Sequence, residues 1–381
     1  MSIEGEIRVT LHWDGRRVGH VGLVSTRPLA AARVLLGRRA GDAAALVPRL
    51  YALCGQAQGA ASVAALRAAG ANPGDLPAVS GWVVALEALQ ETLWRLLIDA
   101  PRSLSLPPQA AVVGPARAAV AQAIATLKSS PGQTQPALAV AADLLGEIAR
   151  RHVYGCDPAA WLATTDAATF DTWRDTASTL PARALARLAA STPGLCRSDT
   201  ALMPDLDDDA WWSAVVPALQ RDPLFAQAPT WGGSPVETGA LSRLQAQPLV
   251  AALIARDGHS AATRFAARLV EGALLLRDMR VANADAAGWV RAWPLGAGVG
   301  LAAVQTARGL LLHQARLAED HITDYRIVAP TEWNFHPQGA LFRGIVGTEA
   351  PDEAALVARA GLAVHALDPC VGFRIEVVRD A

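Results

Sequence analysis

The chain has 381 residues, of which 52% are hydrophobic and 18% charged, a balance that excludes an intrinsically disordered protein. Its 34 basic and 35 acidic residues give a net charge of −1, so we expect neither nucleic acid nor a membrane surface as a partner. No apolar stretch reaches the roughly 20 residues of a membrane span, and without an export signal we expect four reduced cysteines and a cytoplasmic protein.

The N-terminal segment predicts a β-hairpin followed by two helices. Residues from Glu6 to Val24 alternate between apolar and polar around Asp14-Gly15, a dipeptide typical of hairpin turns. After Pro28, the pattern predicts one helix to about Leu36 and a second from Ala43 to Ala69. Cys54 is expected inside this second helix or at a bend of it, where Gly55 and Gly59 let another backbone come close.

The middle of the chain reads as a helical body. We expect helices at about 80–98, 115–127, 137–153, 240–256 and 260–277, with shorter pieces at 155–230. The first three are separated by Pro101, Leu106-Pro107-Pro108 and the Ser129–Gly132 loop. An acidic run at 205–209 is compatible with a metal cluster, but a solvated helix start explains it fully.

From residue 298 the pattern changes to strands. We expect strands at Val299–Thr306, Gly309–Ala318 and Ile322–Val328, a helix at about 352–365, and a last strand over Phe373–Val378. The predicted fold is therefore α+β and mostly α, a helical body with small N- and C-terminal sheets. We expect a single domain over 1–381, with an N-terminal part (1–70), a helical body (71–297) and a β-rich C-terminal part (298–381).

Two cysteines each stand alone in a segment that resembles a motif with two cysteines. Cys54 lies in Leu53-Cys54-Gly55-Gln56-Ala57, and Cys370 lies in Asp368-Pro369-Cys370-Val371-Gly372-Phe373. Both segments resemble the CxxC motifs that hold the nickel–iron centre in the large subunit of [NiFe]-hydrogenases. Here Ala57 and Phe373 occupy the positions of the second cysteines. The chain therefore looks like the enzyme but lacks half of its thiolates.

Three further segments extend this resemblance in the family's order. They are Ile3–Val9 followed by Asp14-Gly15, then Val304–Leu310 with His313, and finally Pro330-Thr331-Glu332-Trp333-Asn334. The region from about 70 to 295 gives no motif match. Because the chain is also short for a catalytic large subunit, it is similar to the HupK (HoxV) group of hydrogenase maturation proteins, and the resemblance implies a reduced large-subunit fold.

The resemblance implies a carrier rather than an enzyme. Such a protein would accept the Fe(CN)2(CO) fragment from the HypC–HypD complex and pass it to the apo large subunit, with no nickel bound. Cys54 and Cys370 would hold the iron, because thiolates are soft ligands and two of them suffice for an iron that brings its own diatomics. Two thiolates do not complete a structural zinc site. The family's bridging cysteines are the absent ones, so the iron would sit displaced from its place in the enzyme.

Other residues are assigned to the site by the same resemblance. Arg308 and Thr331 match the groups that contact the cyanides, although Arg308 is equally explained by a carboxylate partner and Thr331 by a turn cap. Glu332 replaces the expected threonine. Pro330 and His336 lie in the same loop, where His336 is either an extra iron ligand or a backbone-bonded histidine.

Around these, we expect an outer layer of His313, Asp368 and Glu4, with Asp368 capping or orienting the Cys370 loop. Cys156 and Cys196 match no motif and are expected to be buried hydrophobes. Glu376 stands where large subunits have the histidine at their cleavage site, so proteolytic maturation is not expected.

Three other functions remain open from the sequence. The first is a metal-free mimic of the large subunit that binds maturation proteins, with both cysteines simply buried. The second is a divergent hydrogenase, which the absent bridging thiolates disfavour, and the third is an unrelated helical scaffold. The carrier hypothesis requires that Cys54 and Cys370, 316 positions apart, face one cavity.

Overall fold

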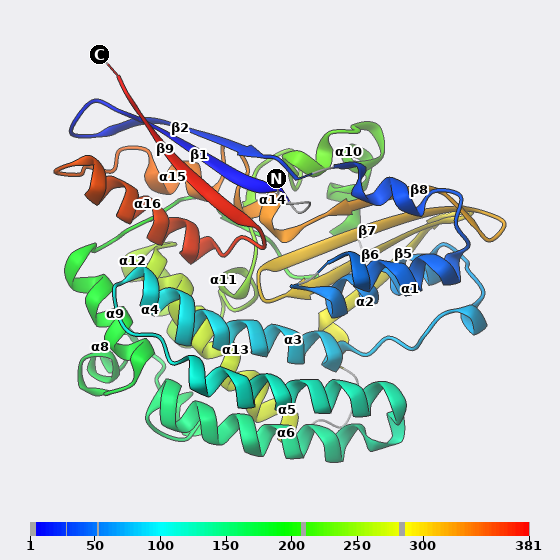
Figure 1. Ribbon diagram of the computed structural model, residues 1–381, viewed down its shortest axis with the longest axis horizontal. Helices are drawn as coiled ribbons and strands as arrows, with labels where there is room; N and C mark the ends of the chain where they lie inside the picture. The colour runs from blue at the N-terminus through cyan, green and yellow to red at the C-terminus, as the bar shows by residue number, and fades with distance from the viewer. Residues whose placement is uncertain (1–4, 28, 52, 207–210, 282–285, 381) are drawn as a thin grey trace.

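The computed structural model describes residues 5–27, 29–51, 53–206, 211–281 and 286–380. Helices form a broad body, and the two ends of the chain contribute sheets along one side of it (Figure 1). This confirms the predicted fold class, α+β and mostly α with small sheets from the chain ends.

The two ends of the chain meet in a three-stranded sheet. Strands β1 (Glu6–Trp13) and β2 (Val18–Ser25) form the predicted hairpin, and β9 (Gly372–Arg379) pairs with β1 in parallel. Every second side chain of β1 is buried, as alternation along a half-buried strand requires. Because β9 follows Cys370 directly, this pairing fixes the C-terminal cysteine segment against the start of the chain.

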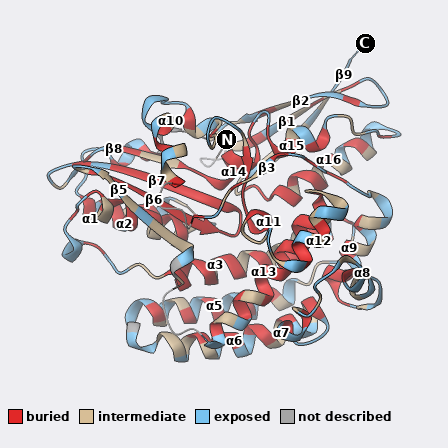
Figure 2. Cartoon of the chain, turned by 180° about the vertical axis from the view of Figure 1, so that it is seen from behind, coloured by how far each residue is buried: buried red, intermediate tan, exposed pale blue. Residues whose placement is uncertain are grey.

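A second sheet of four antiparallel strands has the order β5 (Val290–Gly296), β6 (Val299–Thr306), β7 (Gly309–Ala318) and β8 (His321–Val328). The last three were predicted, and β5 was missed. Both faces of this sheet are covered, so every residue of β6 is buried (Figure 2). Helix α2 (Gly55–Ala68) lies on one face.

The prediction of one helix from Ala43 to Ala69 is wrong. The chain instead forms α1 (Ala40–Leu50) and α2, with Cys54 at the break between them. Tyr51 and Cys54 leave helical geometry, with φ/ψ of −127°/114° and −138°/37°. The close approach expected at the glycines is present, because a Cβ on Gly55 would lie only 2.7 Å from the carbonyl oxygen of Pro48.

The helical body is built around α13 (Ala261–Val281), which is buried over most of its length (Figure 2). It packs against α3 (Gly81–Trp94) and α6 (Thr134–Ala149), and α5 (Ala110–Ser129) packs against both of these helices (Figure 1). The body is completed by shorter helices: α4 (Ala100–Ser103), α7 (Pro158–Trp161), α8 (Ala167–Thr176), α9 (Leu180–Ser191), α10 (Val216–Arg221), α11 (Ala240–Arg243) and α12 (Pro248–Asp257).

Several predicted helix boundaries need correction. Pro101 does not separate two helices, because a π-helical turn at Arg95–Asp99 carries the chain from α3 into α4, where proline occupies the first turn and needs no donor. The helix expected at 240–256 is two helices, with extended backbone at Gln247 before Pro248. The helix expected after Pro28 is a 3₁₀ helix, η1 (Leu29–Leu35).

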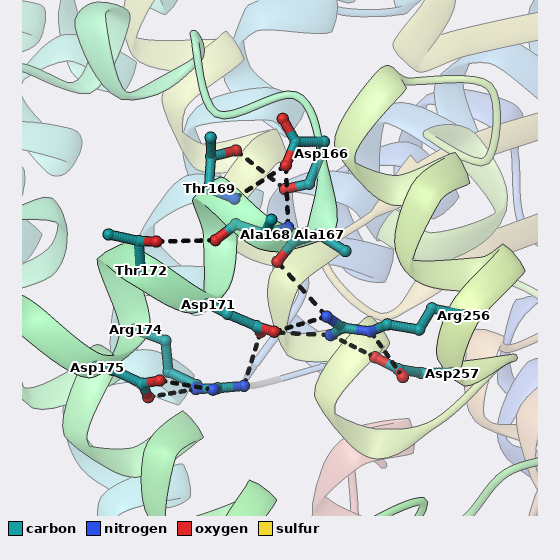
Figure 3. A network of polar contacts seen from close by, with 10 residues as sticks. All are labelled: Asp166, Ala167, Ala168, Thr169, Asp171, Thr172, Arg174, Asp175, Arg256 and Asp257. Carbon is teal, nitrogen blue, oxygen red and sulfur yellow. Dashed lines mark hydrogen bonds and ion pairs between the residues drawn. The ribbon is translucent and has the colours of Figure 1, made fainter.

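Polar contacts on the surface of the body join α8 to α12 (Figure 3). Asp166 caps α8 by accepting from the backbone N–H groups of Ala168 and Thr169, both at 2.9 Å. Asp171 then pairs with Arg256 of α12 at 2.7 Å. The side chains of this ion pair are partly exposed to solvent.

Against the expectation that no apolar stretch is long enough to cross a bilayer, one described helix, α5, passes that test by length and composition alone. It contains Pro115, Arg117 and Lys128, and it packs on the helical body in this structure. The absence of a membrane partner stays a prediction.

Candidate functional site

Cys54 lies at the N-terminus of α2, where the chain turns after α1. The turn is held by Glu87 of α3, whose carboxylate accepts from the backbone N–H groups of Gln56 at 2.9 Å and Ala57 at 3.0 Å. A carboxylate satisfies the free donors at a helix start and complements its partial positive charge. Glu87 therefore fixes the position from which Cys54 projects.

Cys370 follows the last helix, α16 (Glu353–Leu367). Asp368 ends that helix in the left-handed region, with φ at 57°. Thr331 of α14 (Pro330–Asn334) holds the next turn: its hydroxyl accepts from the backbone N–H of Cys370 and lies 3.1 Å from Sγ. Thr331 thus contacts the cysteine itself.

Both cysteines line one cavity of about 600 Å³. Its wall also includes Arg27, Tyr51 and Glu332, together with residues of α10, β8 and η1. The two cysteines therefore line the same cavity despite their separation in sequence; that they hold one iron together stays a prediction.

Cys54 is a protonated thiol in this environment. Burial raises its pKa to about 12, the neighbouring Cys370 and Glu87 raise it further, and Arg308 opposes the shift. Gln58 also reaches its sulfur, with Nε2 at 3.7 Å from Sγ. A metal that bound here would displace the thiol proton.

Arg308 lies in the turn between β6 and β7 and is 5% exposed. It pairs with Glu91 at 2.9 Å and with Asp368 at 3.4 Å, so the carboxylate partners considered for it are present. Its Nε makes no hydrogen bond within the described residues. Burial lowers the pKa of Arg308, but Asp368, Glu91 and both cysteines raise it further, so it stays charged.

Asp368 is a charge partner as well as a helix end. It is 1% exposed and lies 2.6 Å from Arg95, which also pairs with Asp99 at 2.6 Å. Burial would raise the pKa of Asp368, but Arg95 and Arg308 lower it below its ordinary value. The loop before Cys370 is thus fixed by buried charges.

The two histidines assigned to the site differ. His313 is buried and lies 2.8 Å from both the hydroxyl of Tyr325 and Oε1 of Gln58, so it reaches Cys54 only through Gln58. Burial lowers its pKa to about 3, which keeps it neutral. His336 does not line the cavity; its Nδ1 accepts from the backbone N–H of Gln338 at 3.1 Å, the alternative considered for it.

Among the assigned residues that the structure describes, Cys54 and Cys370 line the cavity, whereas Arg308, Thr331, His313, Asp368 and Pro330 do not. Pro330 is buried at the start of α14, next to the wall residue Ala329. Glu4 lies outside the described residues, as do Asp207 to Asp209 of the acidic run. Among the described residues, no group of three or more histidine, cysteine or acidic side chains could hold a metal.

The other cysteines were half correctly predicted. Cys196 is buried, and its carbonyl oxygen accepts from Arg264 at 2.8 Å. Cys156 is exposed, which corrects the expectation that it is buried. It follows Gly155, whose left-handed conformation ends a helix and turns the chain to the surface.

The sequence did not identify three residues near the sulfurs: Arg27, Glu87 and Gln58. Arg27 Nη2 donates to Cys370 Sγ at 2.5 Å, and Nε lies 3.5 Å from Glu332. Arg27 and Glu87 belong to segments without a motif of their own, and Gln58 follows the Cys54 motif directly. The one available signal was Glu332, an acidic residue where the related loop has threonine, since a buried carboxylate requires a cationic partner.

The chain resembles known proteins over nearly its whole length. A family model described as nickel-dependent hydrogenase matches residues 221–373, so its match begins inside the helical body. The hydrogenase expression/formation protein HoxV of Cupriavidus necator is 33% identical over 378 residues, covering 94% of each chain. HupK of Rhizobium leguminosarum bv. viciae, with the same description, is 30% identical and covers 94% of this chain and 92% of its own.

Solved structures show the same fold. The Ni-Fe-Se hydrogenase from D. vulgaris Hildenborough superposes with a TM-score of 0.57 over 93% of each chain, at 17% sequence identity. At that identity the match establishes the large-subunit-like fold alone.

Proposed function

The chain belongs to the HoxV and HupK family of hydrogenase expression/formation proteins, and from this membership we propose that it carries the Fe(CN)2(CO) fragment during [NiFe]-hydrogenase maturation. A role in hydrogenase maturation follows from the family. The carrier role is the finer proposal, and one observation carries it: Cys54 and Cys370 line the same cavity.

The donor set of the cavity suits a fragment that brings most of its own ligands. Two thiolates leave an ordinary metal ion undercoordinated. Among the described residues, no cluster of three or more histidine, cysteine or acidic side chains could complete its coordination. An iron that already holds cyanide and carbon monoxide needs only two more anchors. Arg308 and Thr331 would donate hydrogen bonds to its diatomics, as the family resemblance implies.

Binding through two sulfurs also suits release. The positions that bridge nickel and iron in the enzyme are Ala57 and Phe373 here, so the iron would be held by the other two cysteine positions alone, with no nickel sharing their thiolates. We propose the HypC–HypD complex as the donor and the apo large subunit as the acceptor, in the cytoplasm, with no nickel and no catalytic turnover.

The protein purified anaerobically from a maturation-competent host tests this proposal. We expect cyanide and carbonyl stretches in its infrared spectrum, and their loss in Cys54→Ala and Cys370→Ala. Cys156→Ala is the matched control, because that cysteine is exposed and does not line the cavity. Bands that persist in both cavity variants would contradict the carrier role.

A metal-free mimic of the large subunit is the second candidate. It is favoured by the fold match over 93% of the chain together with the protonated state of Cys54. In that case Cys54→Ala and Cys370→Ala would support hydrogenase maturation as well as the natural chain does. Hydrogen uptake by the isolated chain would instead favour a divergent hydrogenase.

A further inference from the structure

Arg27 occupies a position next to the Cys370 sulfur that the family motifs do not account for. It lies between β2 and η1, with its side chain 18% exposed, and Nη2 donates to Sγ at 2.5 Å. Thr331 contacts the same sulfur at 3.1 Å. The sulfur of Cys370 is therefore held by a cation and a hydroxyl.

Glu332 keeps the guanidinium of Arg27 turned inward. Its carboxylate lies 3.5 Å from Arg27 Nε and accepts from the hydroxyl of Ser25 at 3.2 Å. Glu332 is itself only 6% exposed at its side chain, so this contact is made inside the protein. The residue that departs from the related loop is thus the partner of Arg27.

Charge balance gives Arg27 a role when the cavity is loaded. A ferrous iron with two cyanides and two thiolates carries a net charge of −2, and such a charge needs nearby cations when it is buried. Arg308 is already flanked by the carboxylates of Glu91 and Asp368. Arg27 faces one carboxylate, and its buried Nε makes no hydrogen bond among the described residues.

We propose that Arg27 is a positioning residue for the anionic iron fragment, which rests on the carrier function proposed above. In the empty cavity it holds the Cys370 sulfur. When iron arrives, the iron–sulfur bond replaces the hydrogen bond from Nη2, and the freed donors turn to a cyanide. The step is a ligand exchange without electron transfer: each cysteine binds iron as a thiolate and loses its thiol proton to water, and the two sulfurs replace the ligands through which the donor held the iron.

Infrared spectra of the full chain, purified anaerobically from the maturation-competent host, test this role. We expect Arg27→Gln to lower the cyanide absorbance per chain by about tenfold or more, because a hydrogen bond to a charged group is lost. Arg27→Lys keeps the positive charge but loses the planar guanidinium with its paired donors. This variant should therefore bind the iron fragment only partially and show shifted cyanide bands. Arg38→Gln is the matched control, since Arg38 lies just after η1, does not line the cavity and donates to the carbonyl oxygen of Val34 at 2.7 Å.

The outcomes separate this inference from the carrier proposal. If both Arg27 variants load like the natural chain with unshifted cyanide bands, Arg27 has no positioning role, and the carrier function stands. If the natural chain shows no cyanide bands, the carrier function fails and this inference fails with it. Thermal melting shows whether the Arg27→Gln variant folds. If that variant does not fold, the Arg27→Lys variant tests the inference, because a purely structural role of Arg27 would leave the cyanide bands of Arg27→Lys unshifted.

Discussion

The cavity wall and the helical body differ in what they bury. The body buries mainly apolar side chains, such as Leu138 and Leu145 of α6. Its pair between Asp171 and Arg256 lies at the surface (Figure 3), although Arg264 of α13 and Glu237 form a buried pair inside it. The cavity wall, by contrast, holds the carboxylate of Glu332, which is 6% exposed, and its cationic partner Arg27.

This difference explains which parts of the sequence could be read. An apolar core accepts many combinations of side chains of suitable volume, so the body carries no pattern that identifies it. The cavity needs particular atoms at particular points, and its segments therefore carry recognisable motifs. We infer that stability depends mainly on the body and iron binding on the cavity, and the following substitutions test that separation.

The largest expected loss of stability is for Leu145→Ala. Leu145 is fully buried in α6, which packs against α5 and α13. Removing its side chain should lower the free energy of unfolding by about 3–5 kcal/mol, from lost burial and a residual cavity. Urea denaturation measures this, with Leu144→Ala as the control on the same helix, since Leu144 is 56% exposed. Cyanide absorbance per folded Leu145→Ala chain should equal that of the natural chain; a selective fall would contradict the separation.

The second effect is a pH dependence that originates at the cavity. Burial raises the pKa of Glu87 to about 7 from its ordinary 4.5, although the N–H groups of Gln56 and Ala57 oppose the shift. The folded chain therefore holds this proton more tightly than the unfolded chain does. Its contribution to stability decreases as pH rises from about 4.5 to about 7 and is constant above.

Glu87→Gln should remove that contribution. The difference in unfolding free energy between pH 5 and pH 8 should shift by about 2–3 kcal/mol relative to the natural chain, since one pKa unit corresponds to about 1.4 kcal/mol. Glu147→Gln is the control. Hydrogen bonds from Arg150 lower the pKa of Glu147 to about 2, so its pH dependence of stability has the opposite sign and lies below pH 4.5. An unchanged pH profile in Glu87→Gln would show that Glu87 is ionised throughout this range.

Much of this arrangement could be predicted, because it depends on local patterns. Alternation around Asp14-Gly15 gave the hairpin, and the runs after residue 298 gave β6, β7 and β8. The family resemblance predicted that Cys54 and Cys370 belong to one site, and both line one cavity in the structure. Their role as metal ligands stays a prediction.

The missed features depend on tertiary contacts. The break at Cys54 requires Glu87, which lies on α3 and accepts hydrogen bonds from the first backbone N–H groups of α2. Arg27 became part of the site only because the chain ends pair, and nothing local distinguishes it from other arginines. Strand β5 was not predicted. It contains Pro294, and proline argues against a strand in general but is tolerated on an edge strand such as this one.

The third substitution disturbs the support beneath Cys54. A Cβ on Gly300 of β6 would lie 2.2 Å from the carbonyl oxygen of Ala65 and 2.3 Å from the backbone nitrogen of Ala69. Gly300→Ala should therefore displace α2 from the sheet and lower stability by about 1–3 kcal/mol. Because Cys54 begins that helix, iron loading per folded chain should fall too. Gly114→Ala, with nothing within 4 Å of the added Cβ, should cause neither loss.

The smallest effect is expected at the surface of the body, for Asp171→Ala. Asp171 pairs with Arg256 and Arg174, but its side chain is 34% exposed and that of Arg256 38% (Figure 3). Water and salt screen such pairs, so the loss of stability should stay below about 1 kcal/mol and shrink further at high ionic strength. The chemistry is the same as in the pair between Arg308 and Glu91; only the burial differs. Iron loading should be unchanged, and a loading defect in Asp171→Ala would mean that surface charges of the body contribute to the cavity, so that the two regions are not separable.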